Sequence, residues 1–299
     1  MRRDVICSGG HRWFARALRS RRICNNTFTS YASSSKKKCT SDPRYVDVRH
    51  APREFDVASA VVYPGFVTEE EGNTLIKEAG KRLKRRRFED GHWDAVITKY
   101  REVEMSIPNE QYLQQQNTPN NDISTGIQQY AEIIQDTRMH ISNNHFSEEE
   151  RSNKIIQWLP CHAIDLSADG GLFAHVDSVK FSGGIVAGIS LLSDSIMRLR
   201  PSSEEWEEST LMKESTNQRD DSTAGYVDLY LPQLSLYVLS GMSRYSYTHE
   251  LLPSGSSFEF PQYEENNEDV DMSARQKIDV IRGRRLSIIF RDVNKNPED

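Results

Sequence analysis

A histidine and an aspartate two residues apart, His175 and Asp177, are the side chains of this sequence best suited to carry chemistry. They lie in the short run 172–178, and on a β-strand side chains two residues apart point to the same face. The imidazole and the carboxylate would therefore converge, supplying two of the three ligands of a facial non-haem Fe(II) site. The pair alone is a weak indication, because average composition gives close to an even chance of one somewhere in the chain.

A third ligand has to come from a later strand, and His249 is the candidate. It ends the run 244–249, far from His175 in the sequence but within reach across a closed β-sandwich. Iron held by three protein groups keeps three positions open, enough for a bidentate 2-oxoacid and one oxygen molecule. The alternative for His249 is a structural histidine at a strand end, bonded to the backbone.

The run 283–291 offers a cation for the distal carboxylate of a 2-oxoacid, because a guanidinium is its best planar match. On a strand, Arg285, Ser287 and Arg291 share one face and Leu286 lies on the other. The two arginines would stand roughly 20 Å apart on a straight strand, so Arg285 is the firmer assignment. Arg291 has the alternative of an exposed basic strand edge, which discourages aggregation.

Most of the elements that would position these side chains are strands. From Ile155 onward, short apolar runs separated by Gly, Ser, Asp and Pro are typical of a sandwich, jelly roll or barrel. Before them, the sequence predicts a short strand at 58–66 and a helix at 69–86 that begins at a capping box of Thr68 and Glu71. A further helix is predicted around 127–134. The predicted strand runs are 163–166, 171–176, 185–192, 196–199, 226–231, 234–239, 245–249 and 278–291.

Positive charge gathers at the start of the sequence. Residues 1–40 hold ten Lys and Arg and one acid, a local charge of +9. The whole chain has a net charge of −6, so the other 259 residues carry −15. This arginine-rich, serine-rich and acid-poor composition predicts a mitochondrial transit peptide with a linker over residues 1–45. The alternative is a disordered basic tail that contacts nucleic acid or membrane. No run of about 18 apolar residues occurs, so no transmembrane segment is predicted.

The remainder is predicted to be one domain over residues 55–299. Polar stretches near 106–124, 201–224 and 252–274 interrupt it as loops, because their composition cannot fill a core. Cys161, a lone cysteine after the transit peptide, is predicted to be a small buried hydrophobe rather than a nucleophile. The basic run 81–87 is either a solvated helix end or a patch that contacts phosphates.

The sequence resembles the AlkB-like Fe(II)/2-oxoglutarate-dependent dioxygenases, closest to a mitochondrial homologue. His175, Asp177, His249 and Arg285 followed by Arg291 occur in the order of that family, and the resemblance runs from about residue 57 to 291. The blocks that carry it are 62–66 (VYPGF), 85–89 (RRRFE), 92–94 (HWD), 175–181 (HVDSVKF), 187–193 (AGISLLS) and 282–285 (RGRR).

The resemblance implies a double-stranded β-helix core, one Fe(II) on the three ligands, and 2-oxoglutarate converted to succinate and carbon dioxide. It places Tyr237, the segment Arg285-Leu286-Ser287 and Arg291 at the 2-oxoglutarate, with oxygen as second cosubstrate and ascorbate as reductant in vitro. Without the family, Tyr237 would be a strand tyrosine with a surface hydroxyl. His162 borders the pocket or is structural.

The function expected from these features is that of a dioxygenase of the mitochondrial matrix acting on a protein. The resemblance also suggests a link to regulated necrosis and fatty-acid metabolism. One alternative is a demethylase of methylated bases in mitochondrial RNA, with residues 81–87 as the phosphate grip. Another is a non-enzymatic β-sandwich adaptor that keeps only the shell of the site.

Overall fold

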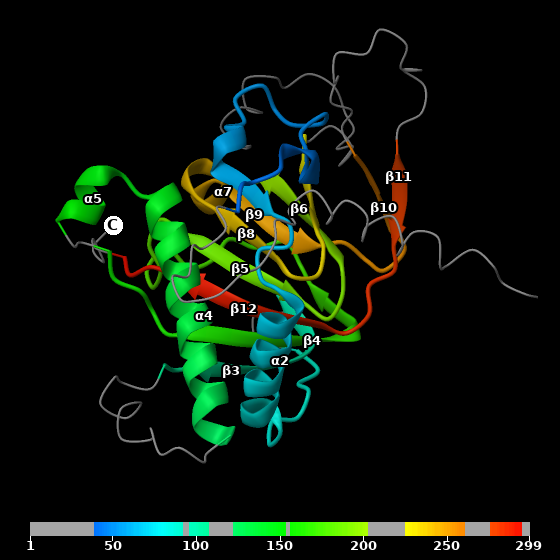
Figure 1. Cartoon of the computed structure of the whole chain (residues 1–299). Helices are drawn as coiled ribbons and strands as arrows, with labels where there is room; N and C mark the ends of the chain where they lie inside the picture. Colours follow the sequence, from blue (N-terminus) through cyan, green and yellow to red (C-terminus); the bar gives the residue numbers. More distant parts are fainter. Residues whose placement is uncertain are drawn as a thin grey trace, which may run out of the picture. The chain divides into compact units, whose positions relative to one another are not determined.

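The computed structural model describes residues 39–91, 96–107, 122–153, 156–202, 225–260 and 276–294 (Figure 1). The chain divides into two units, 1–38 and 39–299, and the fold described below is that of the second. The first 38 residues of the predicted transit peptide and most of the predicted insertions at 106–124 and 201–224 lie outside the described residues. Among the described helices, none is long and apolar enough to cross a membrane.

Six antiparallel strands form the larger sheet, in the order β2-β8-β5-β12-β4-β3 (Figure 1). Strand β3 is therefore at one edge, and the strand that carries Arg285 is inside the sheet. The strands are β2 Ala60–Tyr63, β3 Ile97–Met105, β4 Cys161–Leu172, β5 Val186–Leu191, β8 Ser235–Leu239 and β12 Arg285–Arg291.

A second sheet has four antiparallel strands in the order β1-β7-β6-β9. A separate two-stranded ladder joins β10 to β11, and Phe258 of β10 is buried against Ile196 and Val280. The predicted loop at 252–274 therefore begins with a strand, because Phe258 supplies an apolar anchor. The strands are β1 Val46–Asp47, β6 Ser195–Pro201, β7 Val227–Leu231, β9 Tyr247–Leu251, β10 Ser256–Glu259 and β11 Lys277–Val280.

Two long helices cover the outer face of the larger sheet (Figure 1). Helix α2, Glu69–Leu83, begins at the predicted capping box of Thr68 and Glu71. It ends three residues before the predicted boundary, where the Arg86 N–H bonds to the Leu83 carbonyl in a turn. Helix α4 is longer than predicted and runs over Asp122–His145. Short helical segments complete the described elements: η2 Pro43–Tyr45, η3 Val57–Ser59, α5 Glu148–Ser152 and α7 Gly241–Tyr245.

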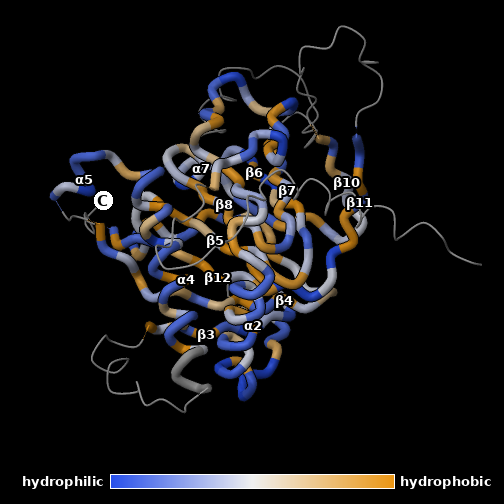
Figure 2. Tube along the Cα trace, in the orientation of Figure 1, coloured by the Kyte–Doolittle hydropathy of each residue, from blue (hydrophilic) through white to orange (hydrophobic). Residues whose placement is uncertain are grey.

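Two hydrophobic clusters pack against the larger sheet, one on each face, and Figure 2 shows many hydrophobic residues along its strands. Leu75 of α2 and Tyr130 of α4 belong to the cluster on the helix side, as does Cys161, whose burial agrees with its predicted role. The second cluster lies between the two sheets and includes Tyr237 and Met197. The predicted fold class, mostly β with flanking helices around a jelly-roll core, is confirmed.

Several predicted strand boundaries are wrong, and two of them concern the candidate site residues. Strand β4 ends at Leu172, so His175 lies beyond it rather than inside a strand over 171–176. The run 278–291 forms two strands, β11 and β12, that belong to different sheets. Between them Ile281 is 75% exposed, whereas Arg282 is buried and donates to the Ser167 carbonyl, so the two apolar stretches do not form one continuous strand.

Candidate metal centre

The three predicted iron ligands come together at one end of the space between the two sheets. One ligand atom from each of His175, Asp177 and His249 lies within 4.8 Å of the others. His249 belongs to β9, whereas His175 and Asp177 follow β4. His175 joins β9 as an isolated bridge: its N–H donates to the His249 carbonyl at 3.3 Å, and the His249 N–H donates to the His175 carbonyl at 2.8 Å. This bridge, rather than a strand, brings the ligands together.

The protonation states of the three groups suit a divalent metal. Burial, with the neighbouring His175, lowers the pKa of His249 to about 3, so its imidazole is neutral at physiological pH. The Nδ1–H of His175 donates to the Phe173 carbonyl at 2.8 Å, which leaves Nε2 as the metal-facing nitrogen. Burial raises the pKa of Asp177, but its polar contact with the His175 ring and the charge of Arg291 outweigh burial and hold that pKa well below its usual value.

Two arginines hold the triad in place. The Nε of Arg291 donates to Asp177 Oδ2 at 2.7 Å and so occupies the carboxylate oxygen turned away from His175. Arg244 is 2% exposed and donates to the backbone carbonyls of Asp177 and Gly183 at 2.9 and 3.1 Å. This role of Arg244 was not predicted from the sequence, where the available signal was an arginine beside two tyrosines, Tyr245 and Tyr247.

Of the predicted 2-oxoglutarate residues, Tyr237, Arg285, Ser287 and Arg291 lie on the inner face of the larger sheet, beside the triad. Arg285 is buried and donates to Ser195 Oγ at 3.1 Å and to Ser190 Oγ at 2.9 Å, and the Tyr237 hydroxyl accepts from its guanidinium. Burial raises the pKa of Tyr237, so its phenol stays protonated. The Ser287 hydroxyl is buried and has no hydrogen-bond partner.

An unpaired buried hydroxyl beside a buried guanidinium fits the distal carboxylate of 2-oxoglutarate, because both groups donate to carboxylate oxygens. Gly188 makes room for this arrangement, since a Cβ there would lie 2.6 Å from the Tyr237 ring. The side chain of Leu286 belongs instead to the cluster under the helices, so it does not face this pocket. Arg291 contacts Asp177 instead. Because Arg285 and Arg291 lie six residues apart on one strand, they contact different groups.

Two curated proteins match most of the chain. The α-ketoglutarate-dependent dioxygenase AlkB homologue 7, mitochondrial, of Mus musculus is 31% identical over 236 residues, 78% of this chain and 78% of that protein. The chain belongs to the AlkB homologue 7 family. The Bos taurus member of the AlkB homologue 7 family is 30% identical and covers 79% of each chain. No family model matches the sequence.

The solved structures that are similar to this chain share less sequence identity with it than the two curated proteins do. A prolyl hydroxylase from Trichoplax adhaerens, in complex with a hypoxia-inducible-factor peptide, is 8% identical with a TM-score of 0.45, over 80% of this chain and 86% of that one. A Pseudomonas putida prolyl-4-hydroxylase is 11% identical with a TM-score of 0.41, over 79% and 93%. The structure of OsALKBH1 has 14% identity and a TM-score of 0.39, over 78% and 97%.

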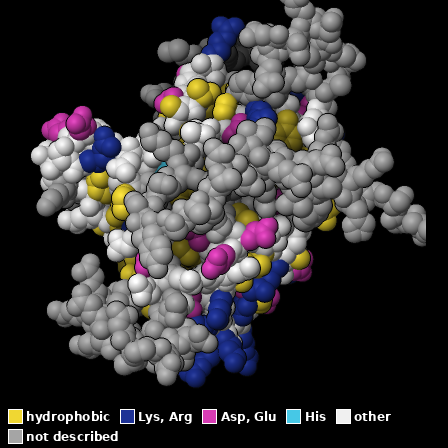
Figure 3. All heavy atoms as spheres, viewed as in Figure 1, with side chains coloured by type: hydrophobic (Ala, Val, Ile, Leu, Met, Phe, Trp, Pro, Cys, Tyr) yellow, Lys and Arg dark blue, Asp and Glu magenta, His cyan; other side chains and the backbone are white. Residues whose placement is uncertain are grey.

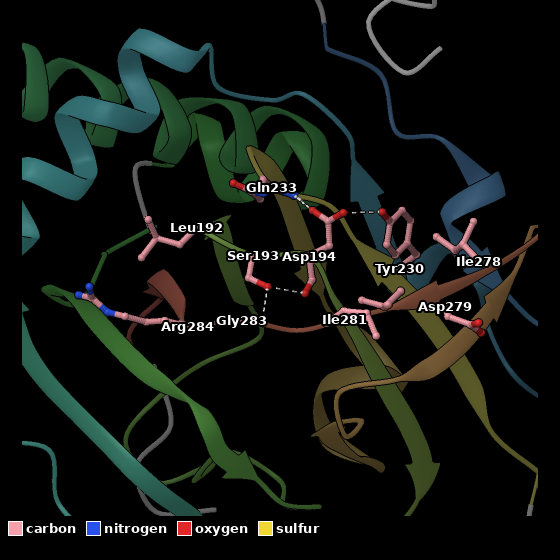
Figure 4. A pocket seen from close by; sticks show the side chains of 11 residues that line it. Leu192, Ser193, Asp194, Tyr230, Gln233, Ile278, Asp279, Ile281, Gly283 and Arg284 are labelled. Carbon is pink, nitrogen blue, oxygen red and sulfur yellow. Dashed lines mark hydrogen bonds between the residues drawn. The ribbon is translucent and has the colours of Figure 1, made fainter. Parts of the chain in front are cut away.

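A surface cavity of about 350 Å³ in this AlkB homologue lies away from the triad (Figure 4). Asp194 in its wall accepts from the Tyr230 hydroxyl and from the Gln233 N–H. The Gly283 N–H donates to Ser193 Oγ. These polar groups already have partners, so the cavity offers little to a ligand. Of the sequence blocks behind the resemblance, residues 92–94 lie outside the described residues.

Proposed function

We propose that this AlkB homologue 7 family member is an Fe(II)- and 2-oxoglutarate-dependent dioxygenase that hydroxylates a protein side chain in the mitochondrial matrix. His175, Asp177 and His249 would hold the metal as a facial triad. Bound Fe(II) would supply the oxidation, in which oxygen and 2-oxoglutarate give succinate and carbon dioxide while a C–H bond of the substrate becomes C–OH. One oxygen atom enters succinate and the other enters the substrate, so atoms and electrons balance.

The observation that carries the proposal is the buried, unpaired Ser287 hydroxyl beside Arg285 and Tyr237, on the same sheet face as the triad. Arg285 and Ser287 would bind the distal carboxylate of the cosubstrate, and the Tyr237 phenol would donate a further hydrogen bond. Arg291 would keep Asp177 ionised and oriented. Ascorbate would serve as the reductant in vitro.

The location in the matrix is supported by two features. The curated relatives are labelled mitochondrial, and the first 40 residues have the cationic, acid-poor composition of an import sequence. The proposal includes a role in regulated necrosis and fatty-acid metabolism, which is supported by the family resemblance alone.

Uncoupled turnover tests the function directly. The full chain is loaded with Fe(II) without oxygen, given ascorbate, 2-oxoglutarate and then oxygen, and succinate is measured. Wild type should form succinate, His175→Ala should not, and the exposed His50→Ala should match wild type. If wild type neither binds iron nor forms succinate, the adaptor alternative replaces the enzyme.

RNA demethylation is a second candidate because a cationic surface is present. Lys84, Arg85, Arg86 and Arg87 are all exposed where α2 ends, and Figure 3 shows Lys and Arg gathered at that end. RNA bound there would lose affinity steeply with salt. The double variant Arg85→Glu and Arg86→Glu would reduce that salt slope, whereas an unchanged slope would show that this surface does not bind RNA.

A further inference from the structure

The inner face of the larger sheet becomes more exposed from β12 toward its β3 edge. Pairing across the sheet places Glu102 of β3, Ile164 of β4 and Ser287 of β12 in one row on this face. Ser287 is 1% exposed, Ile164 is partly exposed and Glu102 is exposed. The cover over the pocket therefore ends between β12 and β4, and the row leads from solvent to the unpaired Ser287 hydroxyl.

The neighbouring row shows the same gradient. It joins Glu104 of β3 to His162 of β4 and Ile289 of β12, and this row continues through Gly188 to Tyr237. Ile289 is 6% exposed, His162 is partly exposed and Glu104 is exposed. His162 thus borders the pocket at its open side. The two rows together identify the mouth of the site as the β3 and β4 side, with a carboxylate at the outer end of each row.

Both carboxylates are available to a ligand. In the described part of the chain, neither Glu102 nor Glu104 has a hydrogen bond or a salt bridge. Glu102 and Glu104 lie at the outer ends of the two rows that lead to Ser287 and Ile289, so a positive charge on an entering group is attracted at the mouth.

We propose that Glu102 and Glu104 select a cationic substrate, and that the protein side chain oxidised at this site is a lysine or an arginine. This inference rests on the proposed function and names its substrate class. A carboxylate pair accepts charge-assisted hydrogen bonds from ammonium or guanidinium groups. A polypeptide fits the mouth better than a nucleic acid, because its backbone carries no charge, whereas phosphates beside a bound base would be repelled by both glutamates.

The test uses capped synthetic peptides that are uncharged except at one central position, which is Lys, Arg, Leu or Glu. Their Kd values are measured by fluorescence anisotropy on the full chain with Fe(II) and 2-oxoglutarate under nitrogen, and succinate above the peptide-free rate is then measured in air. The Lys and Arg peptides should bind about tenfold more tightly than the Leu peptide, since each exposed ion pair contributes up to roughly fivefold. The Glu peptide should bind most weakly.

Charge variants make the test specific. Glu102→Gln with Glu104→Gln should abolish the preference, and Glu102→Lys with Glu104→Lys should reverse it in favour of the Glu peptide. A control with the same change in net charge, Glu69→Gln with Glu70→Gln at the start of α2, should keep the wild-type preference.

Two results would overturn the inference: equal affinity of wild type for the Lys and Leu peptides, or tighter binding of an RNA oligonucleotide with a methylated base than of any peptide. Absence of iron binding and of succinate formation in wild type, with and without peptide, would instead overturn the proposed function.

Discussion

At the scale of single residues, Arg285 and Asp177 divide the site into two functions. Arg285→Ala should retain metal and weaken 2-oxoglutarate binding by about 2 kcal/mol or more, because it removes the guanidinium that donates to Tyr237 on the sheet face shared with Ser287. Asp177→Ala should abolish Fe(II) binding, since it removes the sole anionic ligand. Calorimetry with Fe(II) and with 2-oxoglutarate checks both. Equal loss of both ligands in both variants would contradict this division.

At the scale of elements, the approach of β8 to β5 depends on Gly188. Gly188→Ala should destabilise the protein by about 1–3 kcal/mol, because the new methyl group would meet the buried Tyr237 ring. Gly80→Ala is the matched control. Apart from the backbone of helix α2 itself and its chain neighbours, no atom lies within 4 Å of the added Cβ, so Gly80→Ala should stabilise the protein by about 0.5–1 kcal/mol. Urea denaturation measures both, and equal effects would show that Tyr237 moves freely.

Helix α4 is held to β2 by a contact that depends on pH. The Tyr63 hydroxyl lies 2.9 Å from His145 Nε2, and burial together with nearby His140 lowers the pKa of His145 to about 4. The unfolded chain binds a proton near 6.5. Stability from this group is therefore complete above pH 6.5 and is lost as the pH falls toward 4.

The prediction is that the Tm of wild type drops more between pH 7 and pH 5 than the Tm of His145→Asn. The same comparison with the exposed His50→Asn should leave the wild-type drop unchanged. Identical pH curves for wild type and His145→Asn would show that His145 is accessible to protons in the folded protein.

At the scale of the whole molecule, the metal should stabilise the fold, because its ligands come from β9 and from the segment after β4. Fe(II) at 100 times its Kd would add about 2.7 kcal/mol, a rise in Tm of roughly 5–11 °C for a domain of this size. Thermal unfolding under nitrogen with and without Fe(II) measures the shift. Asp177→Ala should show no shift, and a shift in that variant would point to binding elsewhere.

The sequence predicted the parts of this molecule that follow from local pattern. Alternation on the last strand placed Arg285 and Ser287 on one face and Leu286 on the other, as the structure does. The six-residue spacing between Arg285 and Arg291 also predicted that the two guanidinium groups would lie far apart. The role of Arg244 was missed because it depends on carbonyls of residues 177 and 183, which only the fold brings near. Strand β10 was missed because Phe258 lies in a polar stretch.

The paired backbone hydrogen bonds between His175 and His249 also allow metal binding to be followed by hydrogen exchange at their amides. Each of these two amide protons is covered by the carbonyl of the other ligand. Any opening that carries the 173–177 segment away from β9 therefore exposes both amides together. Their hydrogen-exchange rates should match each other and slow in parallel when metal binds. The backbone would thus record occupancy of the triad without any measurement on the metal itself.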